Sequence, residues 1–331
     1  MALLDRRRLL AAGAAAAGAL AGRGAAAQEA AWPARPLRIV VPFAPGGIVD
    51  VLARLLADRM GRGLGQPLVV ETRPGAGGNI GTALVARARG DAHTLLVGSS
   101  GPLSVSPITE RNLGYDPLND LTPIILLAAT PLVLVVPAGS PHRDVAGLVA
   151  AMRGGPEAMF PTPGLGSPQL LASEAFRQRA DFPAAPVHFS GSAPVVTAML
   201  GGQMQWCFEN LILVLPHLRE GRLRALAVTS RDRAALLPDT PTMAEAGMAG
   251  FEAGGWYGLL APAGVPPEVL ARLHAEAAAA LRDPEMARRI AEMGSPGVSG
   301  TPEAFRALIA AETAKWRSVL LANGGEGGVS R

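Results

Sequence analysis

The 331-residue chain contains few of the residues on which several classes of protein depend. Cys207 is the only cysteine, which excludes an internal disulfide bond and a thiolate cage for a metal ion. Lys315 is the only lysine, and aromatic residues make up 4% of the chain. A nucleic-acid-binding protein needs a dense basic face or a set of aromatic rings that stack on bases. The composition therefore predicts no nucleic-acid partner.

The formal charge of +3 is concentrated at the N-terminus. Residues 1–27 hold four arginines against one aspartate, so the remainder of the chain carries no net charge. Arg6, Arg7 and Arg8 precede an apolar run over residues 9–20, and three alanines end at Ala27. This order is typical of a secretory signal peptide. We expect cleavage after Ala27 and export to the periplasm.

The arginine-rich start of this segment fits the twin-arginine export pattern as well as an ordinary secretory signal. No later stretch is long and apolar enough to span a membrane without an intervening proline or charge. The mature protein is therefore expected to be soluble.

Short apolar runs alternate with glycine-rich turns and helical patterns along most of the mature chain. Residues 37–43 predict a strand, residues 44–47 a turn, and residues 48–60 a helix with apolar residues at helical spacing. Further units of the same kind follow to the C-terminus. Apolar residues make up 49% and charged residues 17%, and the length suits two domains. These features predict an α/β protein with mostly parallel sheets covered by helices.

Five of the predicted strands end in loops rich in glycine and serine. These loops lie at residues 43–50, 75–81, 98–101, 164–167 and 190–192. Ligands of open α/β sheets collect beyond the carboxyl ends of the strands, where backbone N–H groups and helix N-termini bind anions. The loops therefore predict an anion site that needs no cationic side chain.

Other sites have weaker support. The glycines of residues 75–81 resemble a dinucleotide-binding turn, but this turn follows the second strand, and no acidic residue ends the third. The histidines show no metal-ligand spacing, and no catalytic motif is present. His188, within an apolar strand, is expected in the core. Glu209 and Asn210 suit a helix cap and a ligand contact equally well, and Trp256 and Tyr257 suit a pocket wall or the core.

Several long segments carry a resemblance to a known family. They include WPARPLRIVVPFAPGGIVDVLARLLADRM from Trp32, LGQPLVVETRPGAGGNIGTALVARA from Leu64 and LPDTPTMAEAGMAGFEAGGWYGLLAPAG from Leu237. With these segments the mature chain resembles the substrate-binding proteins of tripartite tricarboxylate transporters, the Bug family. The resemblance implies a two-lobed periplasmic binding-protein (Venus-flytrap) fold with two crossover strands. It places the first lobe at residues 28–130 plus 251–331 and the second at residues 131–250.

The resemblance also implies the function: a monomeric receptor, not an enzyme and without a cofactor, that delivers a small carboxylate to two membrane subunits. The first-lobe contacts expected from the matching motifs are Phe43, Ala44, Gly46, Gly47, Asp50, Asn79, Ser99 and Ser100. Asp50 is expected to order its loop rather than to meet the anion. The expected second-lobe contacts are Gly164, Gly166, Ser167, Gln169, Ser190, Gly191, Glu209 and Asn210.

The second lobe departs from the usual family pattern. Pro-Tyr-Lys-Gly is replaced by His188-Phe189-Ser190-Gly191, and Asp-Asn by Glu209-Asn210. These changes favour a ligand less highly charged than citrate, such as a monocarboxylate with an apolar body. Two other functions remain open at this point: an exported NADP-binding oxidoreductase that uses the Gly75 to Gly81 loop, and a receptor that feeds a sensor kinase.

Overall fold

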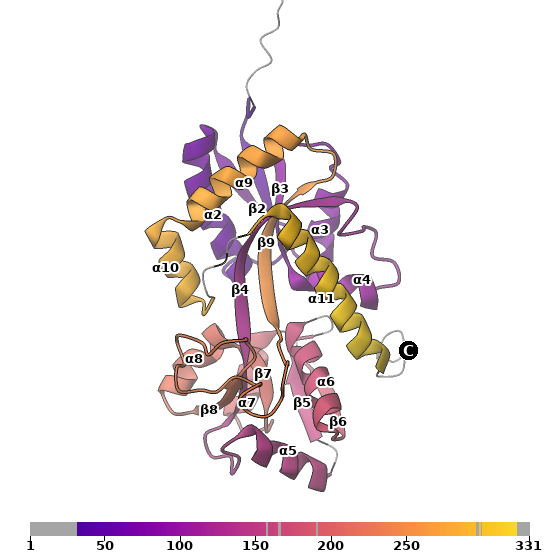
Figure 1. Cartoon of the computed structure of the whole chain (residues 1–331), viewed down its shortest axis with the longest axis vertical. Coiled ribbons are helices and arrows are strands. Elements are labelled where there is room, and N and C mark those ends of the chain that lie inside the picture. Colours follow the sequence, from indigo (N-terminus) through magenta and orange to yellow (C-terminus); the bar gives the residue numbers. More distant parts are fainter. Residues whose placement is uncertain are drawn as a thin grey trace, which may run out of the picture.

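A computed structural model describes residues 32–322 of the chain, except positions 157, 165, 166, 190, 296, 297 and 299. The predicted signal segment therefore lies outside the described residues, as do Gly166 and Ser190 of the predicted site. The chain forms two lobes, one above the other in Figure 1. Among the helices of the described residues, none is both long enough and apolar enough to cross a membrane.

The first lobe is built on a mixed sheet. Its strands, in spatial order, are β2 (Leu68–Thr72), β1 (Leu37–Val41), β3 (Thr94–Ser99), β9 (Gly254–Pro262) and the first part of β4 (Leu121–Pro137). β1 pairs in parallel with β2 and β3, whereas β9 runs antiparallel to both β3 and β4. The predicted parallel core is thus present, and the two strands that connect the lobes supply the antiparallel pairs.

Helices cover both faces of this sheet, because its strands are apolar at successive positions. Ile39 and Val41 pack in a core cluster with α2 (Ile48–Leu64), α9 (Pro267–Leu281) and α10 (Pro284–Glu292). Val40 points to the opposite face, where it packs with α3 (Asn79–Ala86) and α11 (Pro302–Ala322). Successive side chains of a strand point to opposite faces, so a continuous apolar run is buried on both sides. Short helical segments, η1 (Ala76–Gly78), η2 (Gly101–Val105) and α4 (Ser106–Thr109), complete the lobe.

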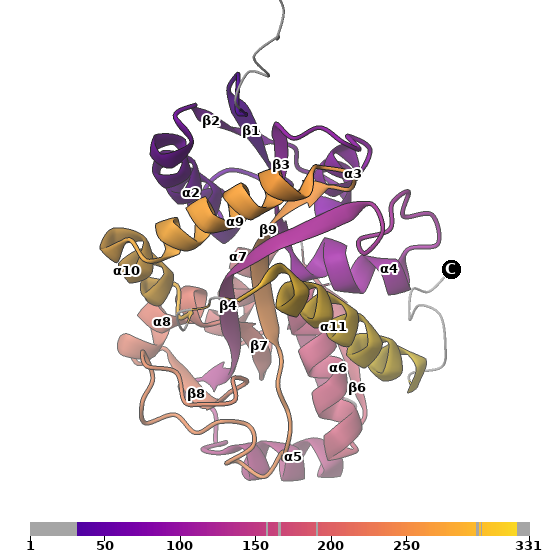
Figure 2. The same cartoon turned by 45° about the horizontal axis from the view of Figure 1, so that its top comes forward.

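The long strand β4 passes from one lobe to the other. Its residues from Leu121 to Pro131 pair with β9, and those from Leu132 to Pro137 pair with β7 (Cys207–Asn210) and β8 (Leu223–Val228). The return connection lies directly before β9. Thr229 joins the two crossings: its Oγ1 accepts from the Leu132 amide at 2.8 Å and lies 2.5 Å from the Ala253 carbonyl. Figure 2 shows β4 and β9 side by side along the centre of the molecule.

The second lobe adds a parallel pair of strands, β5 (Ala158–Thr162) and β6 (Ala184–His188). Its helices are α5 (Val145–Gly154), α6 (Pro168–Ala180), α7 (Ser192–Leu200) and α8 (Leu211–Arg219). Its core holds an aromatic cluster in which Phe176 makes edge-to-face contacts with Phe182, Trp206, Phe208 and Phe251. Several of the few aromatic residues of this chain thus lie in the core of this lobe.

Some elements differ from the sequence expectation. The first part of β4 was not predicted, because its prolines Pro123 and Pro131 interrupt the usual strand pattern. In the second lobe, β7 begins at Cys207, and α8 follows it immediately. The apolar run at the start of α8 has no helical periodicity and includes Pro216 near its end, so the helix was missed.

Candidate functional site

The loop between β1 and α2 supplies the first group of predicted residues. Ala44, Gly46 and Gly47 are exposed, and Gly46 has a φ of +87°, a conformation that favours glycine. Asp50 is buried in the first turn of α2, where its Oδ2 accepts hydrogen bonds from the Gly46 amide and from Arg54 Nε, both at 3.0 Å. The bond from Arg54 holds the pKa of Asp50 below its ordinary value. Asp50 thus fixes the loop from within.

Three first-lobe loops meet around Phe43. A Cβ atom on Gly78 would lie 2.8 Å from the ring of Phe43 and 2.8 Å from Pro102, so only glycine permits this approach. Asn79, the first residue of α3, lies half-buried beside them with its Oδ1 3.0 Å from the hydroxyl of Tyr115. Residues that follow β1, β2 and β3 therefore lie together at one edge of the sheet.

Ser99 and Ser100 are buried at the end of β3. Ser99 is opposite Tyr257 in the antiparallel pairing of β3 with β9. Tyr257 is partly buried where β9 enters the first lobe, and burial, with the nearby Glu209 carboxylate, raises the pKa of its hydroxyl. Tyr257 is thus paired with Ser99 and lies near enough to Glu209 to feel its charge. The sequence left it open as a pocket or core residue, and Trp256 is a core residue that packs on Phe305.

The loop between β5 and α6 is held by side-chain bonds to its own backbone. Ser167 is the N-cap of α6: its Oγ accepts from the Leu170 amide at 3.2 Å and donates to the Gly164 carbonyl at 2.8 Å. Gly164 has a φ of +124°, and its amide donates to Thr162 Oγ1 at 3.1 Å. Gln169 follows in the first turn of α6 and is 3% exposed.

The side chains of the second lobe converge on Glu209, at the end of β7. Its Oε1 accepts from Gln169 Nε2 at 2.7 Å, from Ser192 Oγ at 3.0 Å and from the Asn210 amide at 2.7 Å. Asn210 occupies the N-cap position of α8 but makes no capping bond, and its Nδ2 lies 3.2 Å from the same oxygen. The helix-cap interpretation of this pair is therefore wrong for the Asn210 side chain.

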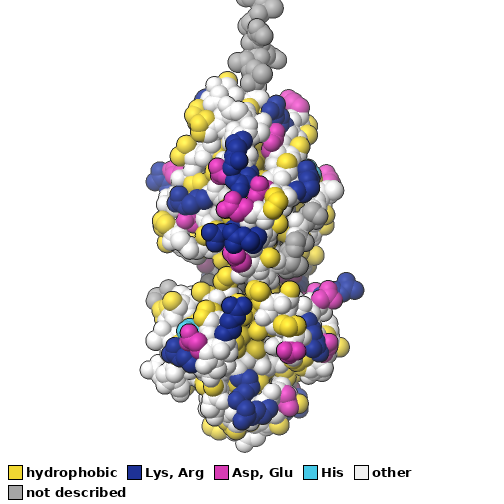
Figure 3. Space-filling model, turned by 90° about the vertical axis from the view of Figure 1, so that its left-hand side faces the viewer, with side chains coloured by type: hydrophobic (Ala, Val, Ile, Leu, Met, Phe, Trp, Pro, Cys, Tyr) yellow, Lys and Arg dark blue, Asp and Glu magenta, His cyan; other side chains and the backbone are white. Residues whose placement is uncertain are grey.

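Each lobe thus places helix N-termini beside its predicted residues. α2 and α3 begin at Ile48 and Asn79 in the first lobe, and α6, α7 and α8 begin at Pro168, Ser192 and Leu211 in the second. The N-terminus of a helix carries a partial positive charge and unpaired N–H groups, which together bind anions. No predicted contact residue is a lysine or an arginine, so the groups among them that could donate to an anion are backbone amides, hydroxyls and side-chain amides. In Figure 3, basic and acidic side chains are interspersed over both lobes rather than gathered in a basic patch.

Two residues of this region were missed or misread. His188 was expected in the core but is exposed at the end of β6, where its Nδ1 lies 3.2 Å from Thr162 Oγ1. β6 pairs with β5 alone, so its alternate residues face solvent, although their neighbours are apolar. Ser192 was not among the predicted contacts, and its position directly after Gly191, at the start of a helix, was the available signal.

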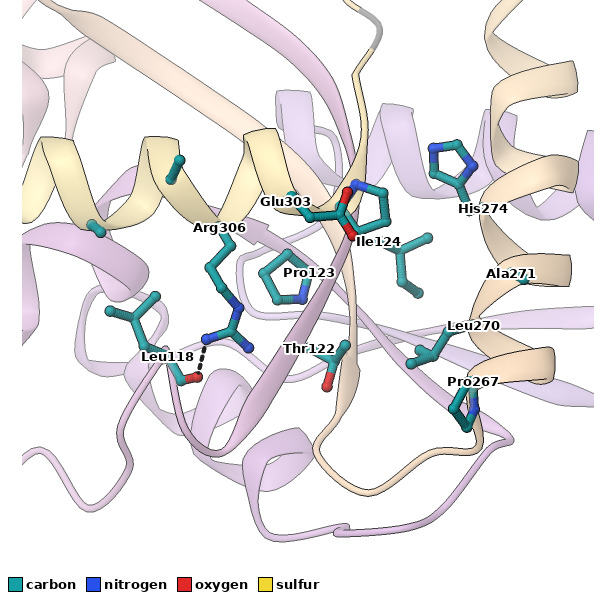
Figure 4. Close-up of a pocket in the computed structure, with 13 residues that line it drawn as sticks. Leu118, Thr122, Pro123, Ile124, Pro267, Leu270, Ala271, His274, Glu303 and Arg306 are labelled. Carbon is teal, nitrogen blue, oxygen red and sulfur yellow. Dashed lines mark hydrogen bonds between the residues drawn. The ribbon is translucent and has the colours of Figure 1, made fainter.

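A cavity of about 820 Å³ lies elsewhere, between α9, α11 and the start of β4 (Figure 4). Its wall is mainly apolar, and none of the predicted contacts lines it. Two of its polar side chains are engaged within the protein: Arg306 donates to the Leu118 carbonyl at 2.7 Å, and His274 Nε2 lies 3.1 Å from the Gly300 carbonyl. The described residues contain no cluster of histidine, cysteine, aspartate and glutamate suited to a metal ion.

Comparison with known proteins identifies the family. The model of the tripartite tricarboxylate transporter family receptor matches residues 52–324. The chain belongs to this receptor family. It is a solute-binding protein rather than an enzyme, and its family relatives include periplasmic binding proteins. The oxidoreductase alternative therefore has no support among its relatives.

The relatives match most of the chain. Protein BugT of Bordetella pertussis (strain Tohama I) is 38% identical over 308 residues, which cover 92% of this chain and 94% of the relative. The solved structure of R. palustris Rpa4515 with adipate is 34% identical with a TM-score of 0.80, covering 89% of this chain and 99% of that one. MatC from Rhodopseudomonas palustris with bound malate is 31% identical with a TM-score of 0.75, and the match covers 87% of this chain and 100% of that one. These structures confirm the predicted two-lobed binding-protein fold.

Proposed function

We propose that this receptor binds a small carboxylate between its two lobes and delivers it to the membrane subunits of a tripartite tricarboxylate-type transporter. The observation that carries the proposal is the set of helix N-termini beside the predicted contacts of each lobe, with no cationic side chain among those contacts. Such a site suits an anion that must be released again, because amides and hydroxyls bind carboxylates without a buried ion pair. The solved relatives with adipate and malate support this class of ligand.

The ligand would lie between residues 28–130 plus 251–331 on one side and residues 131–250 on the other. The pairing of β4 supports a boundary near Pro131, where its partner changes from β9 to the strands of the second lobe. With only two crossing strands, held together at Thr229, the lobes can close about a hinge and bury the ligand.

All the predicted contacts belong to this proposal, including Gly166 and Ser190. The exposed Ile80 and Leu213 add apolar surface at the starts of α3 and α8, with exposures of 57% and 39%. The departures of the second lobe from the family pattern favour a ligand with an apolar body and fewer charges than citrate. Processing after Ala27, twin-arginine export, action in the periplasm and a monomeric state complete the proposal.

A thermal-shift screen of the mature protein against mono-, di- and tricarboxylates, with NADPH as a control, tests it. A ligand at 100 times its Kd stabilises the folded state by about 2.7 kcal/mol, which is several degrees in Tm. A shift with one class of acid supports the receptor. A shift with NADPH and none with any acid would refute it.

Supply of a transporter and signalling to a sensor kinase use the same ligand-binding step. Deletion of the gene separates them: a transport receptor is needed for uptake of the ligand, whereas a sensing receptor is needed for induction of genes by that ligand. Loss of induction with normal uptake would favour the sensor.

A further inference from the structure

Glu209 is a carboxylate buried without a cation. Its residue is 0% exposed and lies near the carboxyl end of β7, where Gln169 and Asn210 of the predicted contacts meet it. The ion pairs of the described residues include none to Glu209. Burial, together with the nearby Glu209 carboxylate, raises the pKa of Cys207 on its own strand and of Tyr257 on β9, so both groups are neutral at physiological pH.

The two oxygens of this carboxylate have different surroundings. Oε1 accepts from Gln169, Ser192 and the backbone and side chain of Asn210, and these three residues stand at the starts of α6, α7 and α8. So many donors on one oxygen favour the ionised carboxylate. The protein's own carboxylate therefore occupies these four donors, while, among the described residues, the backbone amides that begin α6 and α7 make no bond to it.

Oε2 is buried and has no hydrogen-bond partner among the described residues. A buried carboxylate oxygen without a partner raises the free energy of the folded protein by the full cost of its desolvation. A hydrogen-bond donor on a ligand would offset this cost. A ligand carboxylate at the same place would instead set two negative charges side by side.

We propose that Glu209 selects the end of the ligand that enters the second lobe, favouring an N–H donor (an ammonium or an amide) and opposing a second carboxylate. This inference rests on the proposed function, because the first lobe is taken to hold the carboxylate of the ligand. The ligand class is then a monocarboxylate with an amino or amide group at its far end. Its reduced net charge agrees with the loss of the lysine and the tyrosine hydroxyl of the usual family motif.

Calorimetric titration with matched ligands tests the inference. One set of four acids shares a chain length and differs only in the group at the far end: adipate, its monoamide, ε-aminocaproate and caproate. The same four end groups are also compared on chains of succinate and glutarate length. The titrations use the mature protein, Glu209→Gln, and Glu220→Gln as a control at the exposed opposite end of α8.

We expect the mature protein and Glu220→Gln to bind the amine or the monoamide at least tenfold more tightly than the dicarboxylate at one chain length. Glu209→Gln is expected to lose this preference, and its retained binding of some acid shows that it is folded. An unchanged preference in Glu209→Gln would overturn the inference. The inference would also fail if the mature protein bound the dicarboxylate or caproate most tightly. Dicarboxylate binding that takes up a proton would overturn it too, because Glu209 would then be protonated and act as a hydrogen-bond donor. If no carboxylate of any kind binds, the proposed function fails as well; if dicarboxylates alone bind, only this inference fails.

Discussion

The replacement Gly81→Ala tests the packing that brings the first-lobe loops together. Gly81 lies in α3, and a Cβ atom there would lie 2.7 Å from the Arg73 carbonyl oxygen and 2.8 Å from Cα and Cβ of Pro42. Two of these three atoms belong to the backbone and cannot turn aside as the end of a side chain could. The added methyl group must therefore move the loop after β1 away from α3.

Two opposing effects set the size of the change. Alanine is favoured over glycine within a helix by about 1 kcal/mol. Overpacking costs about 1–3 kcal/mol, and three contacts below 3.0 Å place this site near the upper end. We expect a net loss of about 2 kcal/mol in the free energy of unfolding, together with weaker carboxylate binding, because Phe43 and Asn79 lie on the separated loops.

Gly61→Ala is the matched control. Gly61 lies in α2 of the same lobe, and a Cβ atom there would be 3.4 Å or more from every neighbour. The control should therefore keep its ligand affinity and gain up to about 1 kcal/mol from helix propensity alone. Urea unfolding and ligand titration of the three proteins give both quantities. A Gly81→Ala protein that is as stable as the parent and binds its ligand equally well would refute the packing argument.

Three further predictions concern charge and core. Asp50→Asn should lower the free energy of unfolding by about 1–2 kcal/mol at neutral pH, because hydrogen bonds from Arg54 and a backbone amide stabilise the charged form. The pKa of Asp50 is lowered in the folded state, so this difference should vanish as the pH falls below about 4, as measured by thermal unfolding. Glu209→Gln should be more stable than the parent at pH 7, because burial raises the pKa of Glu209 in the folded state. At a pH above the unfolded pKa, each unit of that rise lowers the free energy of unfolding of the parent by about 1.4 kcal/mol. Equal Tm values of the two proteins at pH 7 would contradict this prediction. Phe176→Ala should lower the free energy of unfolding by about 3–5 kcal/mol, because it leaves a cavity within the aromatic cluster. Phe176→Leu should lower it by clearly less, and urea unfolding measures both.

The first lobe could be predicted well from the sequence, because each of its contact loops follows directly on its own strand. The apolar run of β1, the glycines after it and the helical spacing of α2 are adjacent in the chain and predict a strand, a turn and a helix. Parallel pairing then brings the loop ends to one edge of the sheet. The expectation that Asp50 orders its loop came from the family resemblance, and the bond from the Gly46 amide to Asp50 agrees with it.

The second lobe could be predicted only as a set of separate loops. Gln169 and Glu209 are 40 positions apart, and their contact depends on the packing of α6 against β7, which no local pattern indicates. His188 was assigned to the core because its neighbours are apolar, but the narrow β5–β6 pair leaves that end exposed. The pairing of Tyr257 with Ser99 depends on the insertion of β9 between β3 and β4, which no local pattern indicates.

Glu209 shows how stability and selectivity separate at this site. Four hydrogen bonds reach one of its oxygens, yet burial still raises its pKa, so the charged form is less stable in the fold than in water. A residue with a purely structural role would lose stability when replaced, and ligand binding would fall with it. For Glu209→Gln we expect the opposite combination, a higher Tm with a lost preference for N–H donors, because the same unpaired oxygen destabilises the empty receptor and binds the ligand.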